Sequence, residues 1–237
     1  MNILITICAR GGSKGVKNKN IKKINGIPLI KYSIDLAKKF ADKHNAIITL
    51  STEDKLIKNI AEKLGLTTLY KRPLNLSKDE TGKLEVIRHV ILYEENNLNK
   101  KFDFILDLDV SSPLRNLDDL ELALSLLIED KNALNIFSVN NAERNPYFNM
   151  VEKKKNGYYG LVKKGIFYSR QSTPKVFDLN ASFYFFKRSF FNKKNKPMIN
   201  SRTLIYKTPH ICFDIDNQLD FDFMQYLIKN EKLDFNL

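Results

Sequence analysis

Cysteine and histidine are scarce in this chain, and their scarcity excludes several classes of protein. Only two cysteines, Cys8 and Cys212, occur in 237 residues, and each lies inside an apolar run. Two such cysteines cannot build a disulfide scaffold, so we expect buried thiols and a reducing, cytoplasmic setting. The three histidines are scattered without the spacing of metal ligands, and we interpret them as structural residues.

Long apolar segments and the common phosphate-loop motifs are absent as well. No window of about 18 apolar residues occurs, so no membrane span and no membrane partner are expected. The first residues lead straight into an apolar strand pattern, without the basic region and cleavage site of a signal peptide. Neither the Walker A pattern nor the dinucleotide-binding glycine pattern is present, which excludes those two kinds of nucleotide site.

Positive charge is abundant, with 39 Lys and Arg against 27 Asp and Glu and a net charge of +12. An excess of this size can indicate a nucleic-acid-binding protein. The lysines, however, are scattered over predicted helix faces and turns, and aromatic residues do not alternate with them as in a base-stacking surface. We therefore expect no nucleic-acid partner.

Apolar residues alternate between strand and helix patterns over the first 140 positions. Strand patterns are found at 3–8, 46–51, 66–70, 103–109 and 134–139. Helix patterns are found at 28–40, 53–64, 80–95 and 117–129. This alternation, with β-branched strands, predicts an α/β fold with a doubly wound, mostly parallel sheet. A chain of this length suits one domain, 1–237.

The pattern changes at about 140–190, where short aromatic strands follow one another without helices. We expect an inserted β arm whose exposed aromatic side chains, including those of 182–186, form a surface for a partner. A last strand at 211–215 and a helix at 218–229 complete the predicted domain.

The loop after the first strand, CARGGSKGVKNKN at 8–20, is the strongest functional candidate. Its glycines allow backbone N–H groups to approach an anion, and it carries four cations: Arg10, Lys14, Lys17 and Lys19. Because nucleotides bind beyond the carboxyl ends of parallel strands, the loop is placed to hold a triphosphate. A flexible, solvated basic turn is the alternative.

Two pairs of aspartates form the second candidate feature. Strand alternation would place Asp214 and Asp216 on one face, where they repel each other unless a cation lies between them. Beside a polyphosphate that cation is Mg²⁺. Alternatively, Asp216 caps the helix that follows it. Asp107 and Asp109 have the same spacing, and either face the same site or end their strand.

Seven motifs follow one another along almost the whole chain. They are ARGGSKG at 9–15 with KNKN at 17–20, KRP at 71–73 with LS at 76–77, SSPLR at 111–115, RNPYFN at 144–149, RQ at 170–171, NAS at 180–182 and FDID at 213–216. As an ordered set they resemble the CMP-nonulosonic acid synthetases, the cytidylyltransferases that activate sialic acid and its bacterial relatives. Within that family the chain looks most like the CMP-legionaminic acid synthetases.

The resemblance implies a Rossmann-like fold and a homodimer in which the β arm reaches the neighbouring site. It also implies a reaction between CTP and a nonulosonic acid that gives a CMP-sugar and pyrophosphate, with Mg²⁺ as cofactor. Synthetases for CMP-N-acetylneuraminate or CMP-pseudaminate, other nucleotidyltransferases and a non-catalytic nucleotide-binding scaffold of the same fold remain as alternatives.

The same resemblance assigns roles to individual residues. Nucleotide contacts are assigned to Arg10, Gly11, Gly12, Ser13, Lys14, Lys19, Asn20 and Arg72. Sugar contacts are assigned to Asp109, Arg170 and Tyr184, with Arg170 facing the substrate carboxylate. Metal binding is assigned to Asp214 and Asp216, and catalysis to Lys19, Arg10 and Asp216, with one of the aspartates helping to deprotonate the sugar hydroxyl.

Two departures from the family pattern bear on the sugar. Asp109 stands where sialic acid synthetases carry a glutamine that touches the sugar, and Phe148 or Asn149 stands where some members have an arm lysine. A pocket that loses a basic group and gains an apolar one suits a sugar with fewer hydroxyls and more acetamido groups. We therefore expect a preference for legionaminic acid.

Overall fold

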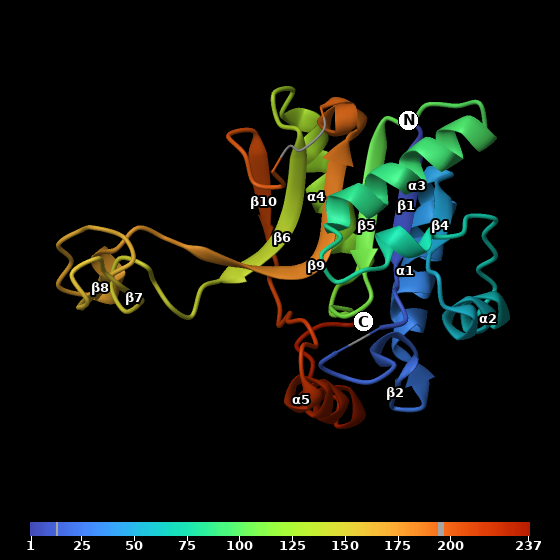
Figure 1. The fold of residues 1–237 in the computed structure, drawn as a ribbon. Coiled ribbons are helices and arrows are strands. Elements are labelled where there is room, and N and C mark those ends of the chain that lie inside the picture. The colour runs from blue at the N-terminus through green and yellow to red at the C-terminus, as the bar shows by residue number, and fades with distance from the viewer. Residues whose placement is uncertain (13, 194–196) are drawn as a thin grey trace.

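A six-stranded sheet forms the centre of the fold in the computed structural model, which describes residues 1–12, 14–193 and 197–237. The strand order is β10-β6-β9-β5-β1-β4 (Figure 1). Its strands are β1 (Ile3–Cys8), β4 (Ile47–Ser51), β5 (Phe104–Asp109), β6 (Asn135–Asn141), β9 (Phe177–Lys187) and β10 (Thr203–Lys207). Only β9 runs antiparallel to its neighbours, β5 and β6, so the sheet is mostly parallel.

Helices cover both faces of this sheet, because its strands are apolar on both sides. Alternate residues of β1 separate into two buried clusters: Ile5 packs with α1 (Leu29–His44) and α4 (Leu117–Glu129). Leu4 packs on the opposite face with α3 (Lys83–Asn97). The Rossmann-like, doubly wound α/β fold that the sequence predicts is thereby confirmed.

The remaining elements are short or lie at the edges of the sheet. They are β2 (Lys23–Ile24), β3 (Ile27–Pro28), β7 (Val151–Lys153), β8 (Tyr159–Leu161), α2 (Lys55–Lys63), α5 (Gln218–Lys229) and the 3-10 turns η1 (Lys19–Ile21), η2 (Leu74–Leu76), η3 (Arg170–Ser172) and η4 (Arg188–Asn192). None of the helices in the described ranges combines the length and apolarity needed to cross a membrane.

Two predicted strands are absent from the described structure. Residues 66–70 alternate between buried and exposed, as in a strand, but pair with no neighbour in the sheet. Residues 211–215 are also irregular, and the strand in that part of the chain is β10, which the sequence pattern did not predict. An extended segment that lies along a core can carry apolar residues as a strand does without pairing in the sheet, as 66–70 shows.

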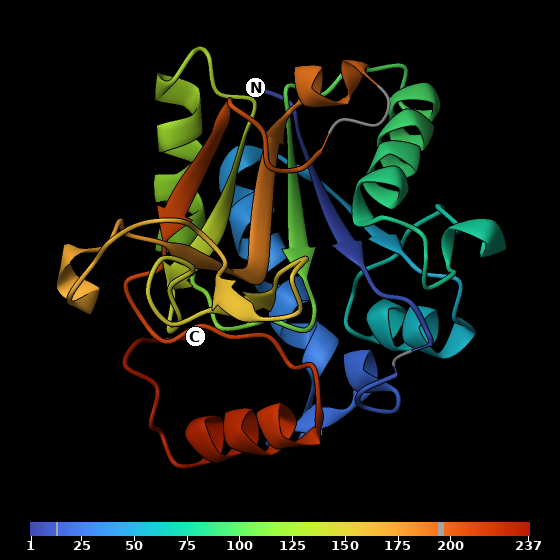
Figure 2. The ribbon, with the colours of Figure 1, turned by 60° about the vertical axis from the view of Figure 1, so that its left-hand side comes forward.

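The aromatic run at 182–186 was predicted to belong to an exposed arm, and that assignment is wrong. These residues lie in β9, at the centre of the sheet, and Phe183 and Phe185 are fully buried. The excursion from the sheet is instead formed by the chain between β6 and β9, which includes the β7–β8 hairpin (Figures 1 and 2). Exposed aromatic side chains on it are Phe148, Tyr158, Tyr159 and Tyr168.

Candidate functional site

The carboxyl ends of β1 and β5 lie at the end of the sheet that points toward α5 (Figure 2). At that end they border a cavity of about 280 Å³. Its lining consists of Cys8, Arg10, Lys14, Gly15, Lys19, Asn20, Asp109, Ser111 and Asp216. The cavity thus combines the basic loop, the end of β5 and the segment before α5, which are far apart in the sequence.

The basic loop is held in place by its own asparagines and by strand β4. Ala9 N–H donates to the Ser51 carbonyl at 2.9 Å, which continues the β1–β4 pairing beyond the end of β1. The Asn20 side chain is buried and donates to the Arg10 carbonyl at 2.9 Å. Asn18 takes a left-handed backbone with φ of 54°, a conformation that asparagine tolerates better than most residues. Asn20 therefore closes the loop, whatever further contact it makes with a nucleotide.

Gly15 brings the loop into direct contact with the segment that carries the aspartates. A Cβ atom on Gly15 would lie 1.7 Å from the Asp216 carbonyl oxygen, so no other residue fits there without movement of the backbone. Lys19 reaches the same segment, with its Nζ donating to the Ile215 carbonyl at 2.5 Å. The loop and the aspartate segment therefore form one wall of the cavity.

Two of the loop cations share a single carboxylate. Arg10 Nη1 and Lys14 Nζ lie 2.6 Å and 2.5 Å from the two oxygens of Asp79. The hydrogen bond from Lys14, followed by the charges and contacts of both cations, lowers the pKa of the Asp79 carboxyl. Asp79 occupies the position of an anion between these cations, so their side chains already converge as binding to a phosphate group requires.

Arg72 lies beside the loop, at the end of β4, and is nearly fully buried. Its Nε donates to Ser51 Oγ at 2.9 Å, and its Nη1 lies 3.9 Å from Glu53 Oε2. The other oxygen of Glu53 accepts from Gly11 N–H at 2.8 Å. Arg72 is thus coupled to the loop through Glu53 but does not line the cavity itself.

Asp214 and Asp216 lie next to each other, although not on a regular strand as predicted. Burial, and then the charge of Asp216, raise the pKa of Asp214, which shows that the two carboxylates repel each other. The cap of α5 is Asn217, whose side chain accepts from Leu219 and Asp220 N–H groups. The alternative that Asp216 serves as the helix cap is therefore wrong.

The SSPLR motif holds the aspartate segment against the end of β5. Ser112 Oγ donates to the Phe213 carbonyl at 3.1 Å, and Ile215 N–H donates to the Ser111 carbonyl at 2.8 Å. These two bonds flank Asp214 on both sides. The position of the metal candidates is thus fixed by the turn that follows β5.

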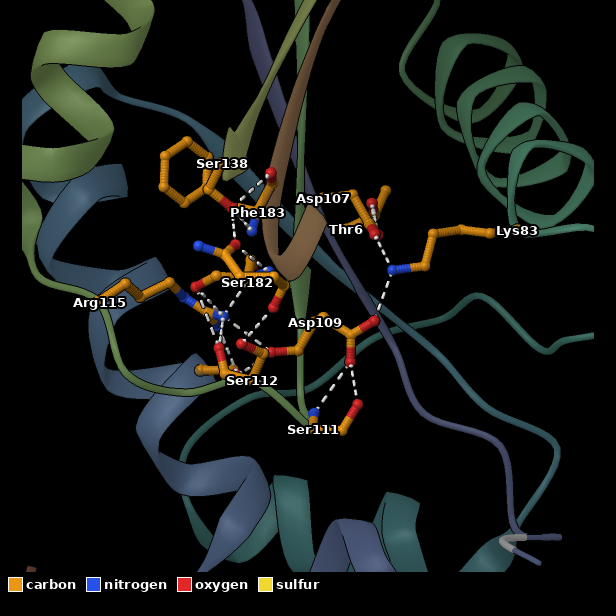
Figure 3. A network of polar contacts seen from close by, with 12 residues as sticks. Thr6, Lys83, Asp107, Asp109, Ser111, Ser112, Arg115, Ser138, Ser182 and Phe183 are labelled. Atoms are coloured by element: carbon orange, nitrogen blue, oxygen red, sulfur yellow. Dashed lines mark hydrogen bonds and ion pairs between the residues drawn. The ribbon is translucent and has the colours of Figure 1, made fainter. Parts of the chain in front are cut away.

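Arg115 anchors this turn from inside the protein (Figure 3). Its Nη1 donates to the carbonyls of Asp109, Ser112 and Ser182 at 2.9, 2.6 and 2.6 Å. Its Nη2 donates to Ser33 Oγ on α1 at 2.8 Å. One buried guanidinium therefore joins β5, its turn, β9 and α1.

Asp109 lines the cavity and forms an ion pair with Lys83 of α3 (Figure 3). Lys83 Nζ lies 2.6 Å from Asp109 Oδ2 and 3.1 Å from Asp107 Oδ2. Asp109 Oδ1 accepts from the N–H and hydroxyl of Ser111. Burial by itself would raise the pKa of Asp109, but the charge of Lys83 and the hydrogen bonds from Lys83 and Ser111 lower it to about 2.

The sequence left open whether Asp107 and Asp109 face the site. Asp109 lines the cavity, whereas Asp107 does not. Its side chain is fully buried, and Oδ1 accepts from the Thr6 hydroxyl at 2.7 Å. Cys8 lies close to it, and burial followed by the charge of Asp107 raises the pKa of the Cys8 thiol. A protonated thiol is a poor nucleophile. Cys8 is half-buried and lines the cavity, so the expectation of a buried thiol is met only in part.

The residues predicted to contact the sugar do not all lie at the cavity. Tyr184 lies on β9 with its ring 4.6 Å from Lys83 Nζ, and burial raises its pKa to about 12. Arg170 lies on the excursion between β6 and β9, where its Nη2 donates to the carbonyls of Ala142 and Glu143 at 3.0 Å. Phe148 lies on the same excursion and does not line the cavity.

Some assignments are met only in part. Gly11 and Gly12 belong to the loop but are not among the cavity residues, and Ser13 lies outside the described residues. Sequence reasoning missed Asp79 and Lys83, because neither belongs to a motif. The available signal was weak: Lys83 lies in the first turn of the helix predicted at 80–95, where a cation opposes the helix dipole.

The aspartate pair meets the requirements of a magnesium site only in combination with a ligand. Within the described ranges, no group of three or more His, Cys, Asp or Glu side chains is placed to hold a metal ion. Mg²⁺ is commonly bound by one or two carboxylates, with water and substrate phosphates supplying the other oxygens. The mutual repulsion of Asp214 and Asp216 fits such a shared site.

Comparison with known proteins gives one family. The family described as Cytidylyltransferase matches residues 4–233. The "CMP-N,N'-diacetyllegionaminic acid synthase" of Campylobacter jejuni is 41% identical over 231 residues, which cover 98% of this chain and 97% of that protein. The "Pseudaminic acid cytidylyltransferase" of the same species is 28% identical over 97% of both chains.

A solved structure has the same fold. The CMP:2-keto-3-deoxy-manno-octonic acid synthetase complexed with CTP superimposes with a TM-score of 0.69, covering 98% of this chain and 100% of that chain. Its sequence is only 15% identical, so the likeness supports the fold alone.

The contact at Gly15 generates a test of how the loop is placed. We expect Gly15→Ala to lower the free energy of unfolding by about 1–3 kcal/mol, because the new methyl group overlaps a backbone oxygen. Gly12→Ala is the matched control, since a Cβ there meets no atom within 4 Å. Urea unfolding of both variants measures the effect, and equal stability of the two would contradict the contact.

Proposed function

The chain belongs to the cytidylyltransferase family, and from this premise we propose that it transfers CMP from CTP to a nonulosonic acid of the diacetyllegionaminic type. The diacetyllegionaminic acid synthase of Campylobacter jejuni, at 41% identity, supports the sugar class. The "Post-translational flagellin modification protein B" of Campylobacter coli is equally similar, at 41% identity. The relatives named for N-acylneuraminate and pseudaminic acid are 25–28% identical.

The observation that carries this proposal is the convergence of charges around one cavity. Arg10, Lys14 and Lys19 supply cations to the cavity lining, and Asp216 supplies a carboxylate next to the loop, close to Gly15. A triphosphate carries about four negative charges, which one such group of cations can neutralise. A non-catalytic scaffold has no need of this arrangement.

The proposed reaction is an in-line displacement at the α-phosphorus of CTP. The anomeric hydroxyl oxygen at C2 of the sugar acid forms a bond to phosphorus, and the bond to the bridging oxygen of pyrophosphate breaks. The hydroxyl proton passes to a carboxylate, for which Asp216 is the candidate. Arg10 and Lys19 stabilise the negative charge that builds up on the phosphate oxygens and the leaving group.

We include Mg²⁺ in this proposal as the cofactor that Asp214 and Asp216 would hold. Mg²⁺ held by these carboxylates would neutralise charge and orient the triphosphate. Burial and then the charge of Asp216 raise the pKa of Asp214, and a cation would offset the second of these effects.

A homodimer is the proposed assembly. The excursion between β6 and β9 carries Tyr158, Ile166 and Tyr168 with 76%, 82% and 94% of their surface exposed, which favours burial against a partner. Arg170 lies on the same excursion. Its described hydrogen bonds go to the carbonyls of Ala142 and Glu143, which do not line the cavity of the same chain. In the proposed dimer Arg170 reaches the sugar carboxylate in the neighbouring site. We place the reaction in the cytoplasm, where CTP is available.

The sugar preference is open to a direct test. We expect CTP and diacetyllegionaminic acid to give a kcat/KM at least about tenfold higher than CTP and N-acetylneuraminic acid, as one group difference in a pocket allows. Pyrophosphate release, measured for each nucleoside triphosphate against a panel of nonulosonic acids, gives the values. Absence of release with every sugar would refute the proposed reaction, whereas a preference for N-acetylneuraminic acid would refute only the sugar.

Lys19 is the catalytic assignment that a single variant tests best. We expect Lys19→Ala to lower kcat/KM by about a hundredfold or more, because charge neutralisation in the transition state is lost. Lys23→Ala is the control, since Lys23 is exposed and lies beyond the loop. Circular dichroism of both variants monitors folding, and near-normal turnover of folded Lys19→Ala would remove Lys19 from the catalytic residues.

A further inference from the structure

Lys83 carries a positive charge at the amino end of a helix, where the helix dipole makes a cation unfavourable. It is the first residue of α3, and only 27% of its side chain is exposed. Two carboxylates offset this cost: Asp107 Oδ2 at 3.1 Å and Asp109 Oδ2 at 2.6 Å. Their charges outweigh the effect of burial and raise the pKa of Lys83 well above its usual value, so the lysine is charged.

The two carboxylates that contact Lys83 lie in different environments. Asp107 is fully buried within the sheet, and its Oδ2 has no hydrogen bond besides this ion pair in the described structure. Asp109 instead lines the cavity that contains Arg10, Lys19 and Asp216. Lys83 thus links a buried carboxylate to one that a ligand can touch.

Asp109 keeps one acceptor position open. An ionised carboxylate has about four lone-pair positions. Ser111 fills two of them at Oδ1, and Lys83 fills one at Oδ2. Oδ2 can therefore accept one further N–H or O–H group, in a direction set by Lys83. The Tyr184 ring, 4.6 Å from Lys83 Nζ, limits movement of the lysine on the opposite side.

A free negative charge at Asp109 would oppose binding of a sugar acid. The substrate carries a carboxylate, and Asp214 and Asp216 already add negative charge nearby. Like charges at such separations repel strongly where water is scarce. A cation in contact with Asp109 removes this repulsion while leaving the acceptor in place.

We propose that Lys83 is the positioning residue of the sugar subsite: it fixes Asp109 as an ionised acceptor for an acylamino N–H or a hydroxyl of the sugar acid and cancels the charge that would repel the substrate carboxylate. The proposal rests on the proposed function. Lys83 itself does not contact the reacting atoms. Its effect therefore falls on the affinity for the sugar acid and leaves the affinity for CTP nearly unchanged.

The test separates the two substrates. We expect Lys83→Met to raise the KM for diacetyllegionaminic acid at least about tenfold, with the KM for CTP within about threefold of wild type. Lys83→Arg, which keeps the charge, recovers most of the loss. In Lys83→Met/Asp109→Asn the repulsion is removed, so the KM for the sugar falls again relative to Lys83→Met. Lys78→Met, an exposed lysine before α3, is the control.

A further variant guards against a folding defect caused by unpaired Asp107. Lys83→Met/Asp107→Asn removes both buried charges and still leaves Asp109 without its partner, so it should fold and show the same defect in sugar KM. A normal sugar KM in that variant, equal losses for both substrates, or no recovery in Lys83→Met/Asp109→Asn would each overturn the proposal. Wild-type enzyme without turnover would instead refute the proposed reaction.

Discussion

The candidate site depends on a single buried guanidinium. Arg115 donates to carbonyls at the end of β5, in the following turn and on β9, and also binds a hydroxyl on α1. Backbone carbonyls that converge inside a protein need donors, and one arginine supplies several of them in a fixed geometry. The turn held in this way positions Asp109 and, through Ser111 and Ser112, also the segment with Asp214. Loss of this anchor would displace both carboxylates together.

The cations and the carboxylates around the cavity come from different parts of the chain. Cations come from the loop after β1, and carboxylates come from the end of β5 and the segment before α5. Asp79 holds Arg10 and Lys14 together, so the loop cations converge before any phosphate arrives. In the proposed function a triphosphate would take the place of the Asp79 carboxylate between these two cations.

The sequence located helices and cavity-lining segments more reliably than it located every strand. The helices at 117–129 and 218–229 formed as predicted, and the basic loop and Asp216 line one cavity, because glycines, clustered charges and helix periodicity are local signals. The roles assigned to these residues stay predictions. The strands predicted at 66–70 and 211–215 were wrong, since both segments are extended or irregular chain that pairs with no strand of the sheet. Four successive aromatic residues at 183–186 indicate a strand buried on both faces rather than an exposed arm. Lys83 could not be found, because its contacts to Asp107 and Asp109 exist only after α3 packs on the sheet.

In the proposed site the loop cations contact the triphosphate directly, whereas Asp214 and Asp216 act on it through Mg²⁺. Calorimetric titration of CTP into the protein, with Mg²⁺ and with a chelator, tests this arrangement most directly. We expect Mg²⁺ to tighten CTP binding at least about tenfold in the wild type and by less than about twofold in Asp214→Asn/Asp216→Asn. A full Mg²⁺ effect in that variant would contradict the account, because the metal would then act without these carboxylates.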